Sequence, residues 1–290
     1  MLVRRVAALR QVAPRGARLL AQQAYAVTPY RELASATAAQ REAWAAQDEL
    51  LHARMKEHVP AALEHNGEES FANHLVGVQS VLRSWSASET LCNAALFHSI
   101  YGTEGFQGYK LPLSHREEIA GLIGPEAERL AWIFCMVDRY TVDQTVLPPS
   151  DAPANALANA GKPPSFYART ELGAFEMPLQ SHAEWLDFLT LTLADWLEQV
   201  EGASSKAVPR PIGDGVLWRK GEAWGYRREA YAGMAQILAA HGVEAAPIMY
   251  NEVFGREPEW SREICQPKTP PMGEASLAAQ EAMESAKWVF

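Results

Sequence analysis

The sequence predicts an all-α fold. Three observations support this: long stretches lack glycine and proline, their apolar residues recur at every third or fourth position, and runs typical of strands are nearly absent. The chain has 290 residues, of which 48% are apolar and 21% are charged, so it is long enough for one large helical domain or two small ones.

The first predicted helices lie between residues 36 and 99. Residues 36–59 are rich in Ala, Glu, Gln and Leu and contain neither glycine nor proline, which predicts one long helix. Residues 69–86 predict a second helix, and Ser86 or Ser88 can cap a third that ends at about Ser99. The apolar face of the second helix comprises Phe71, Leu75, Val78, Leu82 and Trp85.

Two further helices are expected in the middle of the chain. Ser114 is followed three residues later by Glu117, which is the spacing of a capping box at a helix start. The Gly124-Pro125 pair interrupts this helix, and residues 126–140 predict the next one. Residues 144–178 contain five prolines before Pro178, so we expect a long insertion that forms a lid or a surface loop.

The last part of the chain returns to helix. Ser181 begins a helix that runs to about Val200 and is apolar on most sides, which predicts a buried position. Shorter helices are expected at 225–241, 244–254 and 273–288.

Charge is unevenly distributed along the chain. The net charge is −9, yet Met1–Arg31 contains six arginines and no acidic residue. This composition is typical of an organelle transit peptide, and the alternative is a basic arm that docks on a partner. Removal of the first 24 residues, which include five arginines, would change the charge from −9 to −14. We therefore expect a mitochondrial protein, with plastid or cytoplasm as alternatives, whose mature body does not bind nucleic acid.

Cysteine and hydropathy patterns exclude further classes. The three cysteines, Cys92, Cys135 and Cys265, are odd in number and far apart, which argues against a disulfide framework and a structural zinc site. No run of about 18 apolar residues occurs, so we expect no transmembrane helix.

Three polar residues are placed where apolar ones are expected. His74 shares the apolar face of Phe71 and Val78, and His98 ends an apolar run. Asp195 lies inside the apolar stretch Leu191–Leu197. A buried carboxylate is costly unless it is paired or bound to a metal, and two imidazoles with one carboxylate suit a transition metal.

The order of these residues resembles the HD superfamily of helical, metal-dependent phosphohydrolases. Its ligands are a His, a His-Asp pair and a distant Asp, which match His74, His98 and Asp195. The resemblance covers roughly residues 68–241, and it is closest to an HD-like branch carrying "LFHSIYGTEGF" and "LADWLEQ". It implies an HD-domain-like helical bundle with extensions at both ends.

The resemblance also implies a domain organisation. A leader or arm would occupy residues 1–31 and an N-terminal helix residues 32–67. The HD-like domain would occupy residues 68–241, including the insertion at 144–178, and a C-terminal extension residues 242–290.

One residue departs from the family pattern. Ser99 stands where the family has the Asp of the His-Asp pair. A neutral hydroxyl is a poor ligand, so the remaining set is His74, His98 and Asp195, which can hold Fe or Mn or can be a relic that binds no ion. Asp138 is a less favoured fourth ligand.

Other polar residues have weaker signals. His115 follows a predicted helix start and can contact a phosphate or act as an acid, while Arg139 and Arg169 are candidate phosphate contacts or structural ion pairs. Asp195 can instead pair with Arg227 or Arg228. The remaining histidines, expected to be solvated, are His52, His58, His65, His182 and His241.

Two hypotheses of function follow. Ser99 favours a degenerate, non-catalytic HD-like protein, an accessory subunit of a mitochondrial complex whose partners are other protein subunits. The alternative is a metal-dependent HD-type enzyme, either a hydrolase of a small phosphate ester or a mononuclear-iron oxygenase. In that enzyme His74, His98 and Asp195 would hold the metal, and His115 and Arg139 would assist catalysis.

Overall fold

Helices make up most of the described chain, as the sequence predicts. The computed structural model describes residues 37–58, 64–65, 69–104, 110–147, 156, 161–162, 165–204 and 225–255. The helices are α2 (Ala38–His58), α3 (Phe71–Ser84), α4 (Glu89–Phe97), α5 (Arg116–Ile123), α6 (Pro125–Met136), α7 (Arg139–Val146), α8 (His182–Ser204), α9 (Gly225–Ala240) and α10 (Ala245–Gly255). The predicted leader and the predicted helix at 273–288 lie outside the described residues.

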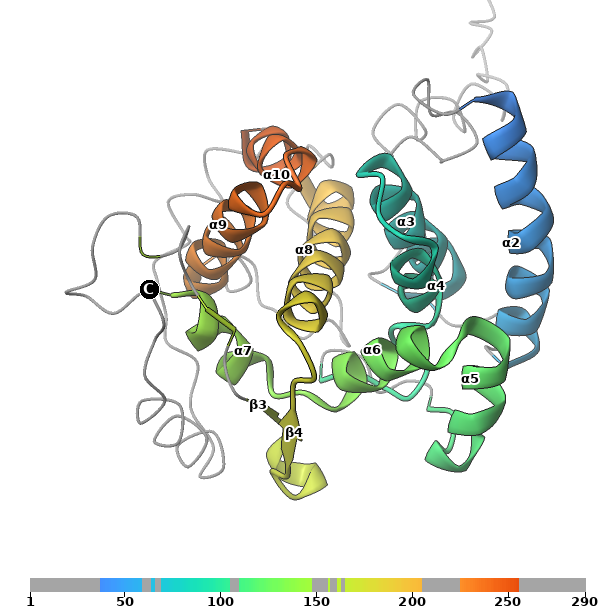
Figure 1. Cartoon of the computed structure of the whole chain (residues 1–290), viewed down its shortest axis with the longest axis horizontal. Coiled ribbons are helices and arrows are strands. Elements are labelled where there is room, and N and C mark those ends of the chain that lie inside the picture. Colours follow the sequence, from blue (N-terminus) through green and yellow to red (C-terminus); the bar gives the residue numbers. More distant parts are fainter. Residues whose placement is uncertain are drawn as a thin grey trace, which may run out of the picture.

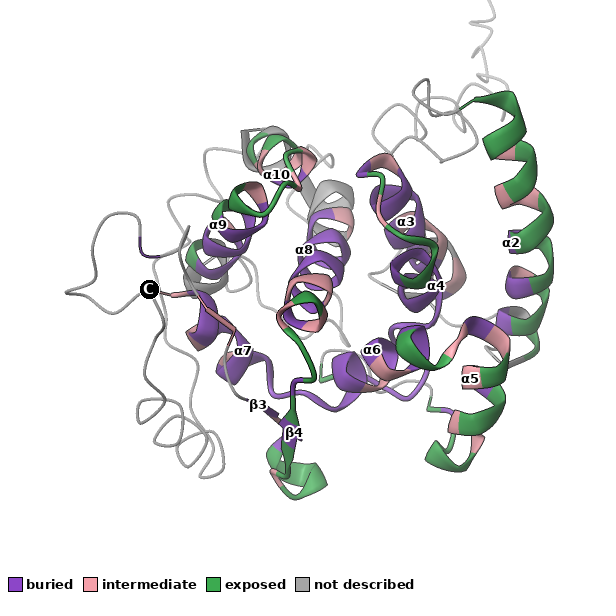
Figure 2. Cartoon of the chain, in the orientation of Figure 1, coloured by how far each residue is buried: buried purple, intermediate pink, exposed green. Residues whose placement is uncertain are grey.

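Helix α8 lies in the middle of the bundle (Figure 1). It packs against α3, α4 and α6 on one side and against α9 and α10 on the other. Its central residues Phe188–Leu197 are all buried, as the sequence predicts, because the helix is covered on nearly every side (Figure 2). Side chains that project from α8 can therefore meet those of α3 and α4 inside the core.

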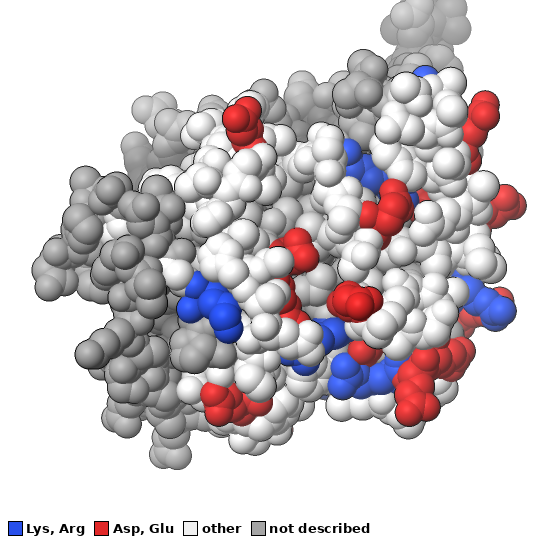
Figure 3. Space-filling view, in the orientation of Figure 1, with Lys and Arg blue, Asp and Glu red and all other residues white. Residues whose placement is uncertain are grey.

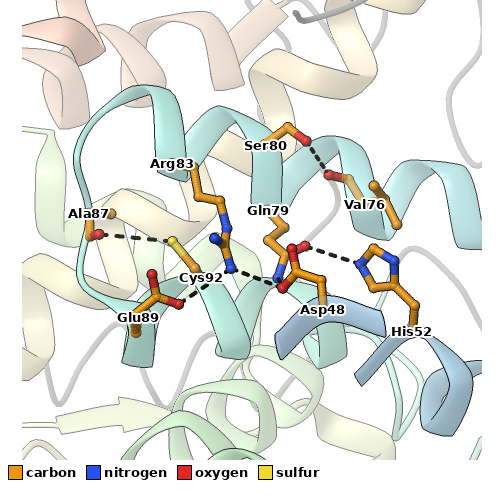
Figure 4. A network of polar contacts seen from close by, with 9 residues as sticks. All are labelled: Asp48, His52, Val76, Gln79, Ser80, Arg83, Ala87, Glu89 and Cys92. Atoms are coloured by element: carbon orange, nitrogen blue, oxygen red, sulfur yellow. Dashed lines mark hydrogen bonds and ion pairs between the residues drawn. The ribbon is translucent and has the colours of Figure 1, made fainter. Parts of the chain in front are cut away.

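Helix α2 covers the outer side of α3 with a narrow buried stripe. Asp48, Leu51 and Met55 are buried while most of the helix is exposed. Asp48 accepts hydrogen bonds from Arg83 at 2.9 Å and from the Gln79 amide at 3.1 Å, both on α3 (Figure 4). His52, expected to be solvated, instead contacts Gln79 at 3.3 Å. A buried ion pair and an amide thus link α2 to the core.

Two helix boundaries differ from the prediction. The expected capping box at Ser114 is wrong, because Ser114 lies within a 3-10 turn (Leu113–His115) and α5 begins at Arg116 without a side-chain cap. The helix expected at 126–140 ends at Met136, where Val137 becomes extended and pairs with Ala168.

Asp138 explains why a new helix starts at once. Its carboxylate accepts hydrogen bonds from the backbone N–H groups of Tyr140 and Thr141, and so caps α7. Helix α7 was not predicted as a separate element, and it continues into the first residues of the expected insertion.

The expected insertion also contains the larger of two short hairpins. Strands β3 (Ser165–Tyr167) and β4 (Glu176–Pro178) pair antiparallel, with a 3-10 turn (Thr170–Leu172) between them. Strands β1 (Glu64–His65) and β2 (Glu69–Ser70) form the other hairpin. Strands of two or three residues leave little periodicity, which is why the sequence did not reveal them.

Basic and acidic side chains are mixed on the described surface. On the face drawn in Figure 3, small groups of basic and acidic side chains alternate, without a broad basic area among the residues shown in colour. Within the described ranges, no helix is long and apolar enough to cross a membrane.

Candidate metal centre

Three helices bring His74, His98 and Asp195 together in the core. His74 lies on α3, His98 is the C-cap residue of α4, and Asp195 lies on α8. Their exposed fractions are 3%, 1% and 6%, so all three are buried as predicted. The amphipathic pattern of α3 and the apolar run of α4 turn these polar side chains inward along with their apolar neighbours.

The ligating atoms form a small triangle. His74 Nε2 lies 3.3 Å from His98 Nε2 and 3.1 Å from Asp195 Oδ1, and His98 Nε2 lies 3.3 Å from the same oxygen. Ligands held about 2.1 Å from one ion are about 3.0 Å apart at right angles and about 3.4 Å apart at tetrahedral angles. The three separations fall within this interval, so the group could hold one metal ion.

Each imidazole is anchored through its other nitrogen. His98 Nδ1 lies 2.6 Å from the Ala95 carbonyl oxygen, which can only accept, so this nitrogen is the donor. His74 Nδ1 lies 2.5 Å from Glu198 Oε2. Such contacts fix the tautomer and ring orientation of metal-ligating histidines, and they leave both Nε2 atoms facing the third ligand.

Glu198 was not found from the sequence, although a signal existed. It lies one helical turn after Asp195, so both carboxylates project from the same side of α8. Gly77, one turn after His74 on α3, gives it room, since a methyl group there would meet the Glu198 carboxyl carbon at 2.9 Å. Gly77 and Glu198 together therefore position His74.

The carboxylates of Asp195 and Glu198 favour a positive charge within the cluster. Burial by itself would lower the pKa of His74, but the charge of Glu198 and the hydrogen bonds to Asp195 and Glu198 outweigh it and raise the pKa to about 10. Burial would raise the pKa of Asp195, yet hydrogen bonds with His74 and His98 hold it well below its usual range. In the absence of metal a proton on His74 supplies the positive charge.

On the side of His98, the described neighbours of the centre are apolar or neutral. The Phe134 ring packs edge-on against the His98 ring, with centroids 4.7 Å apart. The Cys135 thiol lies 3.0 Å from the His98 carbonyl oxygen, and burial raises its pKa to about 12, so it is a neutral donor rather than a thiolate. Ser99 is also buried, next to the ligand His98.

The other predicted site residues lie outside the triangle. The side chain of His115 is 41% exposed and contacts Glu118, in the first turn of α5, at 3.0 Å. Arg139 is buried, with its guanidinium over the Phe134 ring at 3.8 Å. Asp138 caps α7. Arg227 and Arg228, the alternative partners of Asp195, have side chains outside the described residues.

Two of the histidines expected to be solvated contact each other. The rings of His182 on α8 and His241, just after α9, have centroids 4.9 Å apart. His241 is exposed, as expected, and His182 is partly buried. The side chains of His58 and His65 lie outside the described residues.

Comparison with known proteins gives one partial match. Residues 54–139 match a family described as a domain of unknown function (DUF6817). The matched segment includes His74 and His98 but ends before Asp195. No curated protein and no solved structure matches the chain.

Proposed function

We propose that this chain is a metal-dependent enzyme of the HD type, in which His74, His98 and Asp195 hold one divalent transition-metal ion. The observation that carries this proposal is the convergence of two imidazole nitrogens and one carboxylate oxygen at separations of 3.1–3.3 Å. The resemblance of the sequence to HD proteins supports the same three ligands and an HD-like bundle. Imidazole and carboxylate together favour Fe, Mn or Zn over Mg or Ca.

The proposed reaction is hydrolysis of a phosphate ester. Three protein ligands leave coordination positions free, and a bound divalent ion supplies an activated water near neutral pH. Because His74, His98 and Asp195 are buried, their ligand atoms have little contact with bulk water. An oxygenase reaction uses the same ligand set when the ion is iron, so activity with a redox-inert ion such as Zn(II) would favour hydrolysis.

Metal content tests the proposal directly. The purified protein is expected to carry about one metal ion per chain, as measured by inductively coupled plasma mass spectrometry. Asp195→Asn, which keeps the side-chain shape, is expected to lose the ion. His115→Ala, a histidine variant outside the triangle, is the matched control and keeps it. A native protein without stoichiometric metal after addition of Mn(II), Fe(II) and Zn(II) contradicts the proposal.

Ser99 favours a second candidate function. The residue that completes the His-Asp pair in HD proteins is a serine here, which favours a non-catalytic accessory subunit. The arginine-rich segment Met1–Arg31 favours a mitochondrial complex as its location. This candidate predicts co-purification in one stable large assembly and no phosphatase activity toward para-nitrophenyl phosphate with any added metal. A free monomer with metal-dependent phosphatase activity contradicts it.

A further inference from the structure

Two buried arginines beside the proposed metal centre have few partners. Arg139 is 8% exposed and Arg169 is 4% exposed. Burying a guanidinium away from water is costly unless a carboxylate or several acceptors compensate it. Paired arginines elsewhere in the chain show the usual solution, since Arg116 makes two hydrogen bonds to Glu128 at 2.7 and 2.8 Å.

Arg169 lacks such compensation. Its Nε and Nη1 atoms are buried without a hydrogen-bond acceptor. Its Nη2 reaches the Gly102 carbonyl oxygen only at 3.4 Å, and the nearest carboxylate is that of Glu171, which is 63% exposed and lies 3.4 Å from Nη1. A long contact to a solvated carboxylate offsets little of the cost of burial.

Arg139 lacks a carboxylate partner in the described part of the chain. Its guanidinium lies over the Phe134 ring at 3.8 Å. The nearby carboxylate of Glu104 accepts a hydrogen bond from the backbone N–H of Arg139, at 2.9 Å, rather than from the side chain. A guanidinium that rests on an aromatic ring keeps its N–H groups available around its edge.

Both arginines border the same short loop, which starts just after the metal ligand His98. Arg169 contacts Gly102 of this loop, and Arg139 is joined to Glu104. The segments that carry them are paired with each other, because the Arg169 N–H donates to the Met136 carbonyl and the Asp138 N–H to that of Tyr167. The Phe134 ring contacts both Arg139 and His98, with its centroid 3.8 Å from the guanidinium carbon and 4.7 Å from the imidazole centroid. That carbon is thus no more than 8.5 Å from the centre of the imidazole.

We propose that Arg139 and Arg169 bind the phosphate group of the substrate beside the metal centre. This inference rests on the proposed function and deepens it, because it assigns the side chains that hold the phosphate group of the ester. Two guanidinium groups present several N–H donors to the oxygens of one tetrahedral anion. The bound anion would also compensate the two buried positive charges.

Binding to metal-free protein tests this inference separately from the metal centre. The full chain is treated with a chelator and its thermal unfolding is measured with inorganic phosphate, acetate or chloride at equal ionic strength. Phosphate at about ten times its dissociation constant is expected to raise Tm by about 3–5 °C. The response is expected to be lost in both Arg139→Met and Arg169→Met. Arg116→Met, whose arginine is paired with Glu128, is the matched control and keeps the response.

The ligand-free variants provide a second readout. Arg169→Met replaces a poorly compensated buried charge with an apolar side chain of similar length, so the variant is expected to unfold at the same or a higher temperature than the native protein. A fall in Tm larger than that of Arg116→Met shows that Arg169 is structural and overturns the inference. So does an equal response to phosphate and chloride, a stronger response to acetate, or a phosphate response that persists in both variants.

The outcomes separate the two proposals. A phosphate response that depends on both arginines, in a protein that takes up no metal, leaves this inference standing and contradicts the metal centre. Metal uptake by His74, His98 and Asp195 without a phosphate response supports the metal centre and overturns the phosphate-binding role of the two arginines.

Discussion

Helix α3 carries two buried polar clusters that differ in how their charges are balanced. Toward α2, Arg83 meets the Asp48 carboxylate at 2.9 Å, and the Gln79 amide adds a second donor to the same oxygen (Figure 4). Toward α4 and α8, two imidazole nitrogens and a carboxylate oxygen face one another. The first cluster pairs donors with acceptors, whereas the second gathers acceptors around a point.

This difference indicates that the cluster toward α2 is structural, whereas the cluster toward α4 and α8 is the proposed binding site. The ion pair between Arg83 and Asp48, together with the Gln79 amide, joins α2 to α3 and holds α2 against the core. Converging lone pairs repel unless a cation or a proton lies among them. Because the pKa of His74 is raised to about 10, its imidazole is protonated near neutral pH in the metal-free protein. A metal ion would replace that proton.

The largest expected effect is the loss of metal affinity in Asp195→Asn. Losing one of three ligands removes on the order of a third of a binding free energy that is about 10–16 kcal/mol for tight metal sites. Metal affinity is therefore expected to fall about a thousandfold or more, as measured by competition with a chromophoric chelator. An affinity within tenfold of the native value would show that the carboxylate is not a ligand.

Arg83→Met tests the cluster between α3 and α2, in which Arg83 pairs with Asp48. It leaves Asp48 as a buried charge without its ion-pair partner, which is expected to lower the free energy of unfolding by about 3–5 kcal/mol. Metal affinity is expected to stay within about twofold, since the variant leaves the triangle intact. Chemical denaturation and metal titration of the same sample measure both quantities, and a joint loss would contradict the separation of the two clusters.

Gly77→Ala tests whether the contact of Glu198 with His74 strengthens metal binding. The added methyl group displaces the end of a flexible side chain, so little stability is lost, but the hydrogen bond to His74 Nδ1 breaks. Loss of such a contact weakens metal binding by about 10–100-fold. Glu198→Gln, which removes the charge, is expected to weaken binding in the same direction. Gly121→Ala is the matched control, because a methyl group at that helical position meets nothing within 4 Å.

Proton release gives a smaller, graded effect. Because the pKa of His74 is raised to about 10 in the metal-free protein, metal binding below that pH must displace one proton. Metal affinity is expected to rise about tenfold per pH unit between pH 7 and 9, in a buffer that does not bind the metal. Calorimetry in buffers of different ionisation enthalpy counts the protons released. A count of zero would contradict the protonated state of His74.

The same shift affects the stability of the metal-free protein. A folded-state pKa above the unfolded value of 6.5 means that the contribution of His74 is fully present below about pH 6.5. That contribution is lost as the pH rises toward 10. The metal-free protein is therefore expected to lose stability across this range, whereas the metal-loaded protein does not depend on this proton.

Much of the fold and part of the site could be predicted from the sequence. The lack of glycine and proline identified α2, the apolar face of residues 69–86 identified α3, and the apolar run after Ser181 identified α8. Polar residues on apolar faces identified His74, His98 and Asp195, because burial of such residues needs a reason. Glu198 and Gly77 were missed because their roles depend on the approach of α8 to α3, which one-dimensional periodicity does not contain. Helix α7 was missed because Asp138 looked like the end of one helix when it is the cap of the next.

The central claim is that His74, His98 and Asp195 hold one ion. Crystals grown with Mn(II) or Co(II), measured at the absorption edge of the metal, test it most directly. One anomalous peak per chain is expected, about 2.0–2.3 Å from His74 Nε2, His98 Nε2 and Asp195 Oδ1. The absence of a peak there at saturating metal, with the three side chains ordered, would contradict it.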